Sequence, residues 1–144
     1  MTDMSTTHKD EIVNHIFRTT TFTQPTVMAV ALLTTSADDA NTGVFTSGTG
    51  VEVTDLNGYV RQDIGSLNAD WVAPTDGLTS NVAKITFPTV VTSTWGTING
   101  IGLVSSVAHN VGALYYHTDV TTPKALAVDD IAEFAIGAIT VQFD

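Results

Sequence analysis

Apolar and polar positions divide the chain into a short helical segment and a long series of strand-like segments. In "THKDEIVNHIFR", residues 7–18, apolar side chains recur at helical spacing and form one stripe. Thr7 is placed to cap this helix, with Asp10 and Glu11 in its first turn, where negative charge suits the helix dipole. Because a helix of about 11 residues is marginal alone, we expect the stripe to dock on the chain's own core or on a neighbouring subunit. The stripe consists of Ile12, Val13, Ile16 and Phe17.

The chain beyond residue 18 is rich in Thr, Val, Ala and Gly, a composition typical of strands. The run "TVMAVALLT", residues 26–34, is nearly continuous in apolar residues and predicts a central strand buried on both faces. The polar stretch that follows predicts a long surface loop with a small edge strand around Val44–Phe45. Asn57-Gly58 is a dipeptide favoured in tight hairpin turns, so we expect the next strand to begin there.

Further strands are expected towards the C-terminus. Residues 82–87, "VAKITF", alternate in polarity, and Pro88 ends that ladder because it donates no hydrogen bond. Asn99-Gly100 predicts another turn, and "TTPK" at 121–124 separates two strands. In the last strand, Ala132 to Phe143, the apolar positions change parity, so we predict a β-bulge at Gly137–Ala138.

This spacing of strands and turn signals is typical of an all-β sandwich or barrel-like fold. The length of 144 residues fits a single domain, residues 1–144, with residues 1–18 as an N-terminal arm. Trp71 is expected to anchor the loop at 68–81, and Trp95 to fill the core.

Charge and composition exclude several classes of function. Five Lys and Arg against 15 Asp and Glu give a formal charge of −10, which disfavours nucleic acid and anionic membrane surfaces as partners. The absence of cysteine excludes disulfides, thiolate metal sites and cysteine nucleophiles. No apolar run approaches the ~20 residues of a membrane span. The polar, acidic N-terminus does not resemble a secretory signal, so we expect synthesis in a cytosol.

No set of residues carries a catalytic motif, and we predict no catalytic, cofactor-binding or metal-binding residues. The spacing of Gly96, Gly100 and Gly102 matches no phosphate-binding loop, and turns with close strand packing account for it better. His8 and His15 share a helix face, and exposure of both to solvent is a simpler interpretation than a metal site. Paired acids at 38–39 and 129–130 lack the alternating oxygen spacing of a calcium loop, and the second pair suits a turn.

His117 stands two residues before Asp119, so both side chains would point to one side of a strand. Such a pair could orient an imidazole as a base, but no nucleophile motif accompanies it. Pairing on the strand surface is the better account.

Several segments together resemble a family of small virion proteins of tailed bacteriophages. They are "GYVRQ" at 58–62, "ITFPTVVTSTWGTINGIGLVSS" at 85–106, and "ALYYHTDVTTPKALAVDDIAEFAIGAITVQFD" at 113–144. Members of this family are often labelled tail fibre proteins, and similar folds occur as capsid decoration (cement) proteins. The resemblance implies an antiparallel, jelly-roll-like β-sandwich that assembles as a homotrimer on the virion.

The resemblance therefore implies a non-enzymatic structural protein on the capsid surface, bound to the major capsid protein. The alternative is a tail or head fibre component whose long loops bind a host receptor or glycan. Arg61, in "GYVRQ", is one of five basic residues, and its planar donor group suits fixing a loop or a subunit contact. The candidate assembly residues are Ile12, Val13, Ile16, Phe17, Arg61, Trp71 and Lys124.

Overall fold

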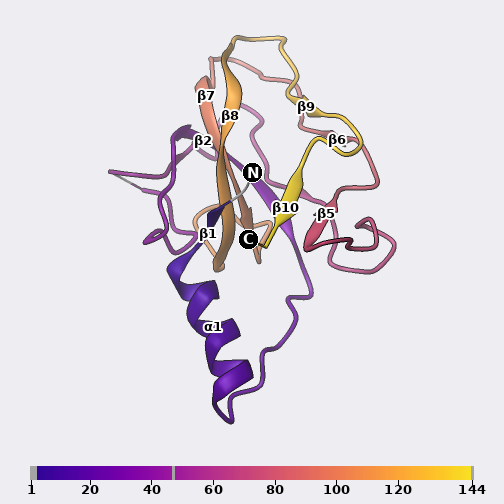
Figure 1. Ribbon diagram of the computed structural model, residues 1–144. Helices are drawn as coiled ribbons and strands as arrows, with labels where there is room; N and C mark the ends of the chain where they lie inside the picture. Colours follow the sequence, from indigo (N-terminus) through magenta and orange to yellow (C-terminus); the bar gives the residue numbers. More distant parts are fainter. Residues whose placement is uncertain (1–2, 47, 144) are drawn as a thin grey trace.

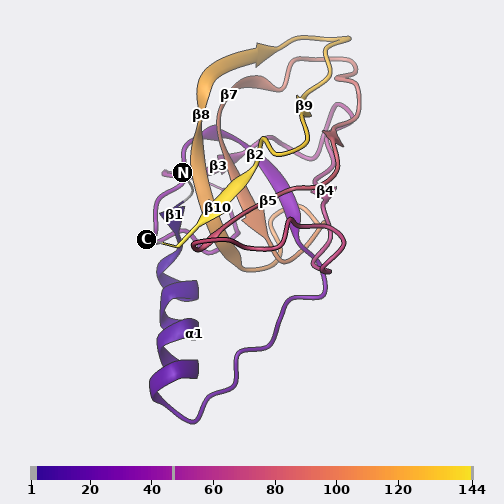
Figure 2. The same cartoon turned by 45° about the vertical axis from the view of Figure 1, so that its right-hand side comes forward.

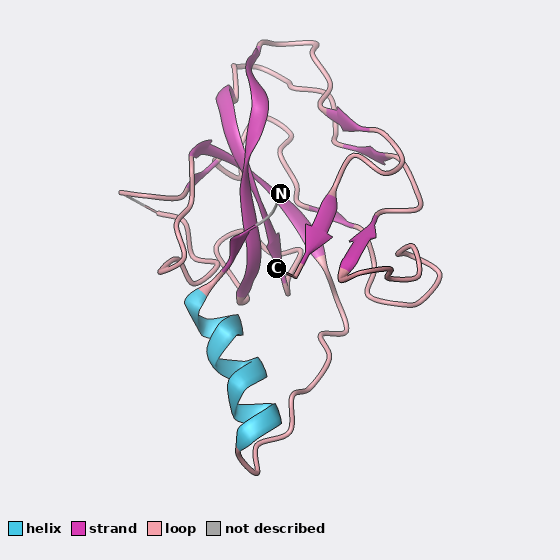
Figure 3. Cartoon of the chain, in the orientation of Figure 1, coloured by secondary structure: helices cyan, strands magenta, loops and turns pink. Residues whose placement is uncertain are grey.

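The computed structural model describes residues 3–46 and 48–143 and shows antiparallel strands with one N-terminal helix (Figures 1 and 3). The predicted all-β sandwich with a short helix is confirmed. In chain order, the elements are β1 (Asp3–Met4), α1 (Thr6–Phe17), β2 (Ala29–Thr35), β3 (Val51–Glu52), β4 (Gln62–Asp63), β5 (Leu78–Ser80), β6 (Ile85–Thr86), β7 (Gly96–Val104), β8 (Leu114–Leu126), β9 (Glu133–Phe134) and β10 (Thr140–Gln142).

One six-stranded sheet forms the first layer of the sandwich. Its strand order is β1-β8-β7-β2-β3, and β4 also pairs with β2. Two small sheets, β5–β10 and β6–β9, lie over one face of it and form the second layer (Figure 2). These pairings join six strands in one sheet and leave two pairs apart, so the finer expectation of a jelly roll is not confirmed.

β2 is buried on both faces, as its continuous apolar pattern predicts. Residues Ala29 to Leu33 have no exposed surface. Val30 and Leu32 contribute to the core between the two layers. Ala29, Ala31 and Leu33 face the opposite side, where they pack with Phe45 beneath the loop that follows β2. The edge strand lies at β3 and not at residues 44–45, where Phe45 is instead buried in this second core.

Gly102 of β7 allows neighbouring side chains to pack closely against the strand. A side-chain carbon on Gly102 would lie 3.2 Å from Leu114 Cδ1 and 3.3 Å from Phe45 Cζ. Asn99-Gly100 is not a turn: both residues lie inside β7, opposite β8. The turn predicted at Asn57-Gly58 does form, with the Tyr59 amide donating to the Leu56 carbonyl at 3.2 Å.

The C-terminal segment is not one bulged strand. The chain turns at residues 135–138, where Gly137 has a φ of +73° and the Ala138 amide bonds the Ala135 carbonyl. β9 and β10 then belong to different sheets. The side chain of buried Asn81 fixes this turn, since it donates to Ala135 O and accepts from the Ile139 amide. The change of parity along the sequence marked a change of sheet.

Two other expectations are corrected. "TTPK" does not interrupt the chain's strands but lies inside β8, the longest strand. The cap of α1 is Ser5 and not Thr7: its hydroxyl accepts from the His8 amide at 3.2 Å. The helix therefore starts earlier, and no acidic residue lies in its first turn.

Candidate functional site

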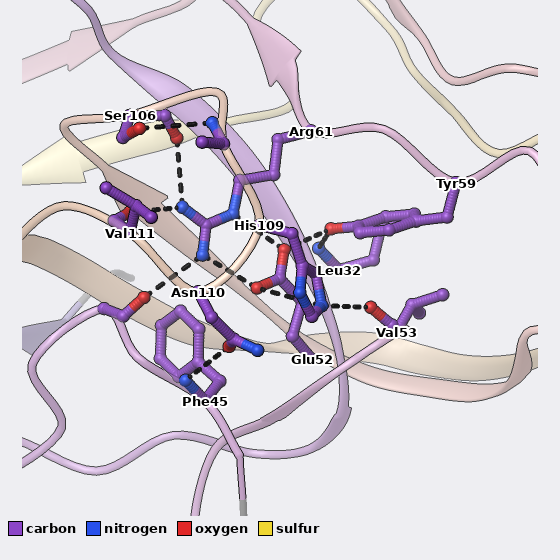
Figure 4. Close-up of polar contacts among 12 residues, drawn as sticks. Leu32, Phe45, Glu52, Val53, Tyr59, Arg61, Ser106, His109, Asn110 and Val111 are labelled. Atoms are coloured by element: carbon purple, nitrogen blue, oxygen red, sulfur yellow. Dashed lines mark hydrogen bonds and ion pairs between the residues drawn. The ribbon is translucent and has the colours of Figure 1, made fainter. Parts of the chain in front are cut away.

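Arg61 lies in the interior of the protein, and its guanidinium joins three separate segments (Figure 4). Nε and Nη2 donate to the two carboxylate oxygens of Glu52, each at 2.7 Å. Nη2 also donates to Gly43 O at 3.1 Å, and Nη1 donates to Ser106 O and Val111 O at 3.0 and 2.7 Å. All five N–H groups of the guanidinium are thereby used.

The carboxylate of Glu52 completes this set of contacts from the other side. Oε1 of Glu52 also accepts from the Tyr59 hydroxyl at 2.7 Å, and that hydroxyl accepts from the Leu32 amide. Burial, together with the charge of Glu52, raises the pKa of Tyr59 far above its usual range. Nε2 of His109 lies 2.9 Å from Val53 O and 3.8 Å from Glu52 Oε2. We refer to Glu52, Tyr59, Arg61 and His109 as the arginine clamp.

The arginine clamp is a structural element. Neither Arg61 nor Glu52 exposes any side-chain surface, and their polar atoms are engaged with the chain itself. The clamp ties the loop at 36–50 and the loop at 105–113 to β3, and the "GYVRQ" segment supplies two of its members. Of the two roles that the sequence suggested for Arg61, the structure shows loop fixing.

A second polar cluster fixes the N-terminal segment to the sheet. β1 pairs with β8 at His117 and Tyr116. Ser5 is fully buried, and its amide bonds Tyr115 O at 2.9 Å. Asp39 lies between Lys9 and His117, with Oδ1 3.0 Å from His117 Nε2 and Oδ2 bonded to the ammonium. The hydrogen bond from Lys9, followed by that from His117, lowers the pKa of Asp39.

His8 is part of this attachment, which corrects the expectation of a solvent-exposed residue. Its side chain is 8% exposed, and its ring packs edge-on against Tyr115 at a centroid distance of 4.6 Å. Nδ1 lies 3.1 Å from a Glu11 carboxylate oxygen. His117 likewise pairs with Asp39 from a distant loop, and not with its strand neighbour Asp119.

The apolar stripe of α1 is not covered by the chain's own core. Val13, Ile16 and Phe17 are 52%, 62% and 78% exposed. The body holds the N-terminal turn of the helix through Ser5, His8 and Lys9. The rest of α1 extends away from the sheets, and its C-terminal end is the farthest from them (Figures 1 and 2).

An apolar groove begins beside α1 and runs towards β5 and β10. It consists of two adjoining hollows of about 450 and 430 Å³. Met28, Trp71, Tyr116 and Phe143 line both. Ile12 lines the end nearest the helix, so the structure brings two of the predicted assembly residues, Ile12 and Trp71, into one surface. We call this surface the apolar groove.

The structure also tests the expectations for the two tryptophans and for Lys124. Trp71 anchors its loop as expected, with its indole N–H donating to Gly65 O at 3.0 Å. Lys124 lies on the exposed C-terminal part of β8, beside a separate hollow of about 380 Å³ that Thr122 and Glu133 also line. Trp95 is 5% exposed and belongs to the core, which confirms its prediction.

Two residues of these clusters carried no signal in the sequence. Glu52 stands in an ordinary alternating segment, and His8 stands on a helix. The scarcity of basic residues was the signal that marked Arg61. With 15 acids in the chain, the sequence did not single out Glu52 as its partner.

No three His, Asp or Glu side chains gather as a metal site within residues 3–46 and 48–143. In the same part of the chain, no helix has the length and apolar content needed to cross a bilayer.

The fold and these clusters define a small antiparallel β-sandwich protein with a protruding amphipathic helix and loops held from inside. The family model of podophage GP4 fiber I protein gp80 matches residues 3–142, so the chain belongs to that family. A search of curated proteins finds no match. The predicted resemblance to a virion protein family labelled as fibre is thus confirmed, and the protein is a structural protein of a phage virion.

Proposed function

We propose that this protein is a non-enzymatic subunit of the virion and that α1 attaches it to a neighbouring protein. The observation that carries the proposal is the exposure of Val13, Ile16 and Phe17 on a helix that leaves the body of the protein. Burying such side chains is worth about 1.5–3 kcal/mol each. The attachment of the first helical turn through Ser5, Lys9 and His8 would hold this apolar end in one direction.

A place in the fibre apparatus is the first candidate location. It is supported by the description of the family, which names a fibre protein. In this location the long loops fixed by the arginine clamp would be presented to a host receptor or glycan. A rigid loop loses less conformational entropy when it binds, so the arginine clamp would favour binding by holding these loops in place.

Capsid decoration, as a homotrimer bound to the major capsid protein, is the second candidate. The compact body supports it, because the longest described helix has 12 residues and the longest strand 13, too short for a fibre shaft. Several weak contacts to a lattice would add through multivalency. In this location the loops would contact the shell.

The test is particle incorporation combined with a cryo-EM reconstruction of the virion. Removing residues 1–18 is unsuitable because Ser5 and His8 are buried. We would compare Ile16→Asp/Phe17→Asp with Leu56→Asp, since Ile16 and Leu56 are 62% and 63% exposed. Loss of the double variant alone from particles is expected. Equal incorporation of both variants contradicts attachment through α1, and the position of the density assigns fibre or head.

A further inference from the structure

We propose that the neighbour which receives α1 is a second copy of this chain, and that the helix end docks in the apolar groove of that copy. This deepens the proposed attachment through α1 and rests on it. The occupant is the segment with Val13, Ile16 and Phe17. The receptor is the surface shared by Met28, Trp71, Tyr116 and Phe143.

The distribution of charge favours a contact between α1 and the apolar groove of a second copy. The chain has a formal charge of −10, so two copies repel each other over most of their surfaces. Residues 5–18 carry two cations, Lys9 and Arg18, and two acids, Asp10 and Glu11, and are therefore neutral. No Asp, Glu, Lys or Arg of the described chain lines the apolar groove. Helix and groove are thus surfaces on which two copies can meet without placing acid against acid.

The exposed side of α1 and the apolar groove are both apolar, and they adjoin each other at Ile12. Ile12 lines the groove, and Ile16 follows it four residues later on the same helix face. Phe143, which lines both hollows, is 50% exposed. An incoming helix would therefore lie beside the receiving copy's own α1 and on the aromatic wall. Helix-in-groove docking uses apolar anchors at this spacing.

The area that the two surfaces would bury also fits a second copy. The three exposed side chains of α1 amount to on the order of 300 Å² of apolar surface, and the groove would contribute a similar area. One such contact falls below the ~1,200 Å² of a specific interface. In a closed dimer each copy gives one helix and receives another across the same interface, so the two contacts together reach that range.

Sedimentation velocity of the purified full chain over a concentration series tests the proposal. We expect the wild type and Leu56→Asp to form a closed oligomer, and Ile16→Asp/Phe17→Asp to be a monomer with an unchanged circular dichroism spectrum. A wild type that stays monomeric at its highest soluble concentration overturns the inference. An assembled double variant overturns it as well.

Disulfide capture tests the geometry, because the natural chain has no cysteine. Phe17→Cys protein is mixed with Ser66→Cys protein, whose altered residue lines the groove. A mixture of Phe17→Cys with Leu56→Cys is the control. We expect at least tenfold more mixed disulfide in the first mixture. Equal yields overturn docking in the groove.

The two proposals fail in different ways. If Ile16→Asp/Phe17→Asp is lost from particles while the purified wild type is a monomer, α1 binds another virion protein, and only the inference about a second copy is wrong. If the double variant is incorporated normally, the proposed attachment itself is wrong.

Discussion

Replacing Arg61 with methionine tests the arginine clamp as the main support of the loops. The variant keeps an apolar stem but removes five hydrogen bonds, two of them to the carboxylate of Glu52. Glu52 then remains buried without its cation. Breaking a buried ion pair in this way costs about 3–5 kcal/mol. For a chain of this size, that loss lowers the melting temperature by about 10–20 °C.

The assay is equilibrium unfolding in urea at neutral pH, followed by tryptophan fluorescence. A second variant separates the buried charge from the lost loop contacts: Arg61→Met/Glu52→Gln removes the carboxylate charge but keeps an acceptor for the Tyr59 hydroxyl. Since an unpaired buried charge is a substantial part of the cost, we expect the double variant to regain about 1–2 kcal/mol relative to Arg61→Met alone.

Lys84→Met is the control, because it breaks an ion pair with Glu133 whose side chains are 55% and 45% exposed. We expect it to leave the free energy of unfolding nearly unchanged. The reasoning is refuted if Arg61→Met costs less than about 1 kcal/mol. Additive losses in the double variant would show that the carboxylate charge is not what makes the single variant unstable.

Three further predictions concern single side chains. Trp95→Ala is expected to cost about 3–5 kcal/mol in urea unfolding, because the indole is buried and donates to Asn57 O; a near-normal value would contradict a core role. Asp39, whose pKa is lowered, adds stability that is present above its unfolded pKa of 3.8 and is lost as pH falls below it; Asp39→Asn should flatten this acid loss, measured as urea midpoints at a series of pH values. Burial raises the pKa of Tyr116 to about 12, so its neutral phenol contributes stability that is fully present below the unfolded pKa of 10 and is lost as pH rises from 10 through about 12; half of the phenolate absorbance of the folded protein appearing by pH 10 would contradict it.

Short sequence patterns predicted correctly those features of the fold that nearby residues determine. The continuous apolar run around Ala29–Leu33 required burial on both faces, and Asn57-Gly58 required a tight turn. The C-terminal segment shows the limit of this reasoning. A bulge and a change of sheet produce the same change of parity, and the choice is made by Asn81, more than 50 residues away, which bonds both sides of the turn.

Sequence patterns could not predict the arginine clamp for the same reason. The sequence marked Arg61 as unusual and suited to fixing a loop, but its partner depends on how strands meet. β3 and β4 both pair with β2, one near each end of that strand, and this brings Glu52 and Arg61 together. An acid-rich chain offers many possible partners, so charge alone could not select Glu52.

The "TTPK" segment shows where copies of the protein should not meet. β1 covers only His117 and Tyr116 on the outer edge of β8, and no other described strand pairs there. An open edge is a template for pairing with another chain, and proteins protect such edges with proline, lysine and irregular register. All three occur here: Pro123 lacks an N–H, Lys124 is exposed, and the pairing shifts between Asp119 and Lys124. Extension of the sheet into a neighbour is therefore disfavoured along this edge, and Lys124 has a reason to be exposed other than a subunit contact. The open edge of β8 therefore does not compete with the proposed contact between α1 and the apolar groove.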